Sequence, residues 1–70
     1  MPQMRPVTSS AVAAIGYDAR AEGLCVEFVG GETYVYERVP SVIWRALQAA
    51  DSKGRFVNAV LKPHFACRKA

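Results

Sequence analysis

The sequence predicts an α+β domain in which a three-stranded antiparallel β-meander is followed by two short helices packed on one sheet face. Three observations lead to this fold class. Apolar residues alternate with others across residues 11–37, the pair Gly30-Gly31 interrupts the alternation, and a repeat of about 3.6 residues replaces it after Val39-Pro40. The 70 residues are too few for two domains, and folding at this size hides only about 60% of the surface of the unfolded chain. The core must therefore be thin.

Three strands are expected between residues 11 and 37. The first covers residues 11–17, and the polar stretch 18–23 supplies a turn. The alternating apolar set of this first strand is Ala11, Ala13, Ile15 and Tyr17. In the second strand Leu24, Val26 and Phe28 share one face. The third strand, residues 33–37, is rich in β-branched and aromatic residues, which favour strands.

The turn at Gly30-Gly31 decides which sheet face Tyr34 and Tyr36 occupy. A two-residue loop would pair Val26 with Val35 and expose both tyrosines, where they could stack unpaired bases. A three-residue loop would pair Val26 with one of the tyrosines and place both in the core. Burying two tyrosines removes more apolar surface from water than burying the residues beside them, at about 25 cal/mol per Å². We therefore predict that Tyr34 and Tyr36 are a structural aromatic pair.

Two amphipathic helices follow the third strand. The first opens at Pro40 or Ser41, and the second is capped by Asp51 or Ser52 and ends at Pro63. Their expected apolar stripes are Val42, Ile43, Ala46, Leu47 and Ala50 in the first and Phe56, Val57, Val60 and Leu61 in the second. Neither helix exceeds three turns, so each must be stabilised by packing on the sheet.

The pattern indicates one folded unit with irregular ends. We expect residues 1–9 to be a flexible lead-in, 10–65 a single domain and 66–70 a loosely held basic tail. The N-terminus lacks the apolar stretch of a signal peptide, and no run approaches the roughly 20 apolar residues of a membrane span. Cys25 and Cys67 are interpreted as reduced thiols. These features predict a cytoplasmic protein without a membrane partner.

The sequence offers no recognisable catalytic or metal site. His64 is the only histidine and lies just past Pro63 in the basic tail, so we expect a surface residue rather than part of a catalytic triad or a multi-histidine metal site. The six acidic residues are scattered over turns and strands rather than paired. The order Ser52-Lys53-Gly54 is not that of a Walker-type phosphate loop. We expect a protein that is not an enzyme and that uses no metal, cofactor or small-molecule substrate.

Several short motifs together resemble the KTSC domain, a small bacterial domain found alone and at the C-terminus of some lysyl-tRNA synthetases. The resemblance covers most of the chain. Its motifs are Ser9-Ser10, Ile15-Gly16-Tyr17-Asp18, Tyr34-Val35-Tyr36, Val39-Pro40, and Ser52-Lys53-Gly54-Arg55-Phe56 with Asn58. Phe56 and Phe65 stand where the family often has tyrosine, and Val57 where it often has an aromatic residue. The resemblance implies RNA binding through its association with a synthetase.

A net charge of +3 is compatible with such a polyanionic partner. The second helix starts with two cations, Lys53 and Arg55, although the positive end of a helix dipole disfavours them. An arriving phosphate would offset that cost. We therefore predict a primary anion contact at Ser52, Lys53, Gly54 and Arg55, with Lys62, Arg68 and Lys69 adding sequence-independent attraction.

Trp44 supports an alternative function. It lies slightly off the apolar stripe of the first helix, at the expected edge of the core, and tryptophan is enriched where proteins meet partners. If exposed, it would indicate a protein-interaction or homo-oligomerisation module that uses Trp44 and neighbouring apolar surface. Binding through such a surface would depend much less on salt than binding to RNA.

Overall fold

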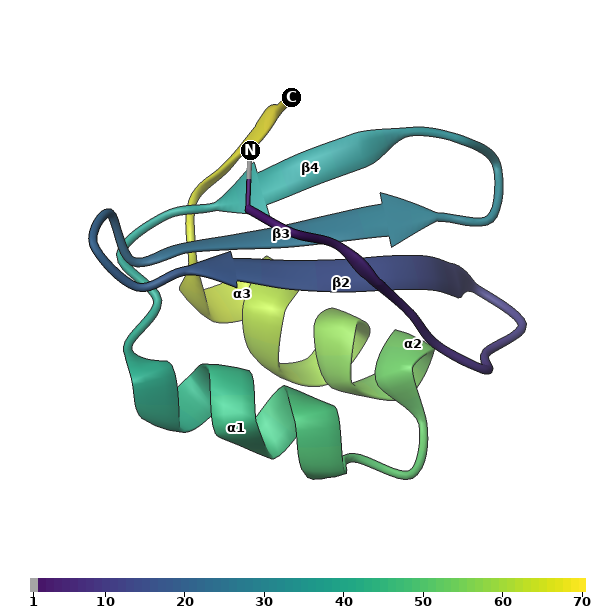
Figure 1. The fold of residues 1–70 in the computed structure, drawn as a ribbon. Coiled ribbons are helices and arrows are strands. Elements are labelled where there is room, and N and C mark those ends of the chain that lie inside the picture. Colours follow the sequence, from purple (N-terminus) through teal and green to yellow (C-terminus); the bar gives the residue numbers. More distant parts are fainter. Residues whose placement is uncertain (1) are drawn as a thin grey trace.

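A five-stranded antiparallel sheet with helices on one face forms the fold (Figure 1). The computed structural model describes residues 2–70. The strands follow one another across the sheet in chain order. Their bounds are β1 Arg5–Pro6, β2 Val12–Asp18, β3 Gly23–Phe28, β4 Thr33–Tyr36 and β5 Cys67–Lys69. The α+β class and the central meander are confirmed, whereas the predicted number of three strands is wrong.

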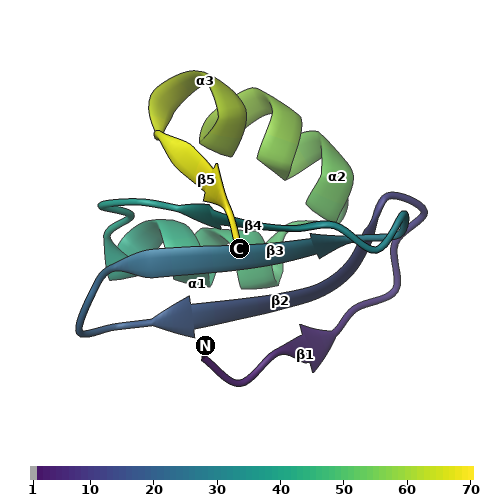
Figure 2. The same ribbon diagram turned by 90° about the horizontal axis from the view of Figure 1, so that it is seen from above.

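The two additional strands come from segments that were expected to lie outside the domain. β1 pairs with β2 through Arg5 opposite Ile15, and β5 pairs with β4 through Lys69 opposite Tyr34 (Figure 2). Both strands are short and exposed, so they lack the apolar alternation of a half-buried strand. Their formation depends on hydrogen bonds from a neighbouring strand. Residues 66–70 are therefore not a loose tail, because the β4–β5 ladder holds most of them.

The β3–β4 hairpin has the three-residue loop favoured by the area argument. Val26 lies opposite Tyr34, and Leu24 lies opposite Tyr36. Gly31 in the loop has a φ of 99°, which glycine adopts at little cost. The Tyr36 side chain is 2% exposed in the core, and Tyr34 is half-buried against it. Both tyrosines therefore lie on the core face of the sheet, in the register that the area argument favoured.

A bulge in β2 changes which residues of the strand face the core. The register shifts between Val12 and Ala14, so Ala13 is an additional residue on this strand. Val12 and Ile15 consequently both enter the core, although residues three apart on a regular strand face opposite sides. The expected inward set was therefore wrong at Ala11 and Ala13.

The helices cover one face of the sheet. The first, α1, spans Ser41–Ala49. The second helical segment runs without a break through α2 Lys53–Phe56, the π-helical turn η1 Val57–Leu61 and α3 Lys62–His64. Val57 and Leu61 are buried, and Phe56 and Val60 are half-buried, which confirms the predicted stripe. Within residues 2–70 no helix is long and apolar enough to cross a membrane.

Only part of the expected apolar stripe of α1 faces the sheet, where Ile43 and Leu47 pack in or against the core as predicted. Leu47 is buried and Trp44 is half-buried against the core, whereas Val42 is 57% exposed and Ala46 is also exposed. The Trp44 ring stacks on Tyr17 of β2, with ring centroids 5.6 Å apart and planes at 11°. An indole covers more apolar surface than a valine, so Trp44 takes the inward position. Trp44 thus lies at the core edge.

Candidate nucleic-acid interface

Positive charge is segregated in the last part of the chain. Between Ser52 and Ala70 there are five lysine or arginine residues and no aspartate or glutamate, so all six acidic residues precede Ser52. This acid-free segment folds as the second helical segment and β5, which lie next to each other beyond β4 (Figure 2). The basic residues are therefore gathered on neighbouring elements, but they differ in what they contact.

The ammonium group of Lys53 is bonded to the end of α1. Its Nζ donates to the backbone oxygens of Gln48 at 3.1 Å and Ala50 at 2.6 Å. The last carbonyls of a helix lack partners within the helix and carry its negative dipole end, so a lysine there is favourable. The apparent conflict of a cation at the start of the second helix is thereby resolved. The expected conflict with the helix dipole is therefore no argument for a phosphate at Lys53.

The neighbours of Lys53 have distinct roles. The Ser52 Oγ accepts a hydrogen bond from the Arg55 backbone N–H at 3.2 Å, which confirms the predicted cap. Gly54 packs closely on the loop before β2, because a Cβ at this position would lie 3.0 Å from the Cβ of Ala11. The Arg55 side chain is exposed and forms no hydrogen bond or ion pair within residues 2–70. Arg55 is thus available to a ligand.

Lys62 and Lys69 lie beside two aromatic rings, and we call Phe28, Tyr34, Lys62 and Lys69 the lysine–aromatic cluster. The Lys62 ammonium lies 5.8 Å from the centre of the Phe28 ring. Phe28 meets Tyr34 edge to face, with centroids 5.9 Å apart and planes at 70°. Lys69 lies opposite Tyr34, and its Nζ donates to Glu32 Oε2 at 3.1 Å. This hydrogen bond and the charge of Glu32 raise the pKa of Lys69, which therefore stays cationic at neutral pH.

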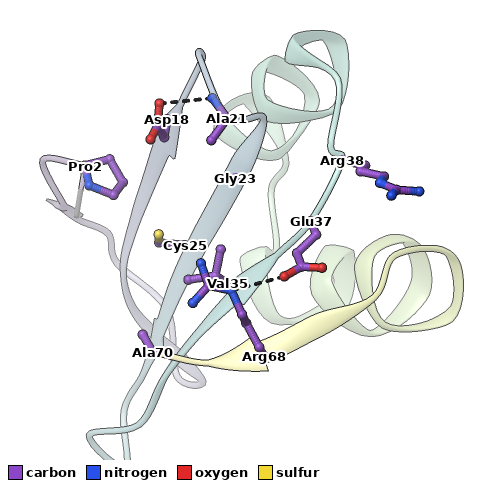
Figure 3. Close-up of a pocket in the computed structure, with 10 residues that line it drawn as sticks. All are labelled: Pro2, Asp18, Ala21, Gly23, Cys25, Val35, Glu37, Arg38, Arg68 and Ala70. Carbon is purple, nitrogen blue, oxygen red and sulfur yellow. Dashed lines mark hydrogen bonds and ion pairs between the residues drawn. The ribbon is translucent and has the colours of Figure 1, made fainter.

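Arg68 faces the other side of the sheet, because successive residues of a strand alternate between faces. Its Nε donates to Glu37 Oε2 at 3.1 Å. On this face Arg68, Cys25 and Val35 line part of a groove of about 630 Å³ (Figure 3). Cys25 is 2% exposed, and burial raises the pKa of its thiol. Arg68 and the lysine–aromatic cluster consequently lie on opposite faces.

The predicted site residues therefore separate into three groups. Lys53, with Ser52 and Gly54, is occupied by contacts at the junction of the helices, and Arg68 lies on the far face. Arg55, Lys62 and Lys69 remain on or beside the second helical segment. Sequence reasoning missed Phe28 as a neighbour of Lys62, and no local pattern signals the pairing of Lys69 with Glu32 across 37 positions. Among residues 2–70 no three histidine, cysteine or acidic side chains gather as a metal site.

The fold and this surface define a small α+β domain with one acid-free, basic segment. The chain belongs to the KTSC domain family, whose model matches residues 8–65. The crystal structure of a KTSC domain protein from Yersinia pestis is similar, with a TM-score of 0.92 and 41% identity, covering 100% of this chain and 99% of that one.

Two relatives are similar in sequence. One, described only as a protein, comes from Tsukamurella paurometabola and is 50% identical over 62 residues, which make up 89% of this chain and 92% of the relative. The other, an uncharacterised protein from Stutzerimonas stutzeri, is 47% identical over 55 residues, or 79% of this chain and 78% of the relative. These matches establish the family and the fold.

Proposed function

We propose that this chain is a non-enzymatic, cytoplasmic RNA-binding domain that contacts phosphates through Arg55, Lys62 and Lys69. The observation that carries the proposal is the acid-free segment from Ser52 to Ala70, which holds five of the nine basic residues on neighbouring elements. Cations clustered on an acid-free segment attract a polyanion and release its counterions. Two of them, Arg68 and Lys69, are paired with carboxylates of the preceding elements, Glu37 and Glu32. RNA, rather than another polyanion, is favoured by the family's occurrence beside a tRNA synthetase.

The existing ion pairs do not block this role. The Lys69–Glu32 pair joins two side chains that are 63% and 57% exposed. Exposed pairs of this kind contribute little, because water and salt screen them. A phosphate can therefore replace Glu32 as the partner of Lys69. Arg68 can add only longer-range attraction from the opposite face.

A salt titration tests the proposal. Anisotropy of a labelled RNA should report binding that weakens as salt rises, and Arg55→Glu or Lys62→Glu should weaken it further and reduce the salt slope by about one per lost phosphate contact. Arg45→Glu, on the exposed side of α1, is the matched charge control and should have a smaller effect. Absence of binding by the wild-type chain at low salt would refute the proposal.

Self-association is the second candidate, and one observation favours it. Val42 is 57% exposed on α1, and the exposed Ala46 and Ala49 follow at helical spacing along the same side. Trp44 would contribute only part of its ring, because one face stacks on Tyr17. Sedimentation of the wild type and of Val42→Lys tests it: a dimer lost in the variant supports self-association, and a monomer in both excludes it.

A further inference from the structure

The Phe28 ring is covered on one face by a lysine side chain. It is half-buried at the end of β3, and it packs against the Tyr34 ring in a T-shaped pair with centroids 5.9 Å apart. One ring face lies under the ammonium group of Lys62 at 5.8 Å. Lys62 is exposed, so its long side chain can leave the ring without disturbing the core. The ring face is thus protected by a displaceable cation.

The surrounding charges suit a nucleotide. Lys62 lies over the Phe28 ring, and Lys69 lies opposite Tyr34, the residue whose ring meets Phe28. A phosphate that binds Lys62 would draw the ammonium away from Phe28 and leave the ring face open beside the bound backbone. An unpaired base on that backbone has a free π-face that can stack there. A base inside a duplex has no free face, because its neighbours cover both sides.

We propose that the lysine–aromatic cluster binds single-stranded RNA, with an unpaired base stacked on Phe28 and the adjacent phosphates held by Lys62 and Lys69. This inference rests on the RNA-binding function proposed above and adds the class of RNA. Tyr34 acts as a positioning residue, because its contact with Phe28 holds the ring in the stacking orientation. Duplex RNA can use the cations alone and therefore binds more weakly.

The test compares one labelled oligouridylate of about ten nucleotides with the same strand annealed to its complement, at equal salt. The wild type should bind the single strand about tenfold more tightly than the duplex. Phe28→Leu, which keeps an apolar side chain in the core, should remove most of that preference. Phe56→Leu is the matched control, since Phe56 is also half-buried and carries no cation over its ring within residues 2–70.

A second variant and a spectrum separate stacking from charge. Lys62→Met keeps the aliphatic stem and should weaken single strand and duplex alike, while adding the single strand to the wild type should shift the ring proton signals of Phe28. Equal affinities for both RNAs with a silent Phe28→Leu would overturn base stacking but leave RNA binding intact. No binding of either RNA would overturn the proposed function and this inference together.

Discussion

Lys53 is a residue whose side chain stabilises a different helix from the one that contains its backbone. It begins the second helical segment, but its ammonium group bonds the carbonyls of Gln48 and Ala50 at the end of α1. From the sequence it looked misplaced, because the dipole of its own helix disfavours it. A lysine shortly after a helix end is itself a C-terminal signal. This signal predicts a structural role for Lys53 at the end of α1.

The role of Lys53 predicts a change in stability rather than in ligand affinity. Lys53→Met should lower the free energy of unfolding by about 1 kcal/mol, because two carbonyls at the end of α1 lose a charged donor. Arg55→Met is the matched control and should cost almost nothing, since its side chain is exposed and unpaired within residues 2–70. Urea unfolding of the two variants measures the difference. Equal stability would contradict the capping role.

At the scale of elements, the hairpin between β3 and β4 shows what local chemistry can decide. The pair Gly30-Gly31 located the turn, and the apolar area of the tyrosines selected the loop length. The two edge strands were not predictable in this way, because Arg5–Pro6 and Cys67–Lys69 contain no apolar alternation. The bulge at Ala13 was equally invisible, since it depends on how β2 fits β3.

The two glycines of this loop should respond differently to alanine. Gly31→Ala should destabilise the domain by about 1 kcal/mol or more, because its φ of 99° is strained for an L-residue. Gly30→Ala should be neutral or slightly stabilising, since Gly30 does not have a positive φ and no atom lies within 4 Å of an added Cβ. Thermal unfolding compares them. A neutral Gly31→Ala would mean that the loop adopts another conformation.

At the scale of the whole molecule, the sheet separates two kinds of surface. The helix side carries the core and the lysine–aromatic cluster, and the other side carries Cys25 and Arg68. Sequence reasoning grouped Arg68 with Lys69 because they are adjacent in the chain. In a strand, adjacency means opposite faces. The predicted anion site could not be resolved into its parts before the tail was known to be a strand.

Thiol and phenol groups with raised pKa values make the domain less stable at alkaline pH. Burial raises the pKa of the Cys25 thiol and of the Tyr36 and Tyr17 phenols, and the Glu22 and Asp18 carboxylates add to the shift at Tyr17. The unfolded chain loses these protons first, so the folded state binds more protons above about pH 8. The stabilisation is complete below that pH and is lost as the pH rises through the raised values.

We therefore expect the urea midpoint to be constant near neutral pH and to fall steadily above about pH 9. Tyr36→Phe keeps the ring and removes one ionisable group, so it should flatten the fall relative to the wild type. A midpoint that is unchanged up to about pH 11 would show that these groups ionise as easily in the folded state as in the unfolded chain.

The sequential strand order also bears on the kinetics of folding. The β1–β2, β2–β3 and β3–β4 pairings each join segments separated by a short stretch of chain, so they close small loops at low entropic cost. The β4–β5 pairing instead encloses both helices, with Tyr34 and Lys69 brought together from distant positions. If local structure dominates the folding transition state, contacts of this kind form after it. Weakening β5 should then speed unfolding while leaving the folding rate almost unchanged.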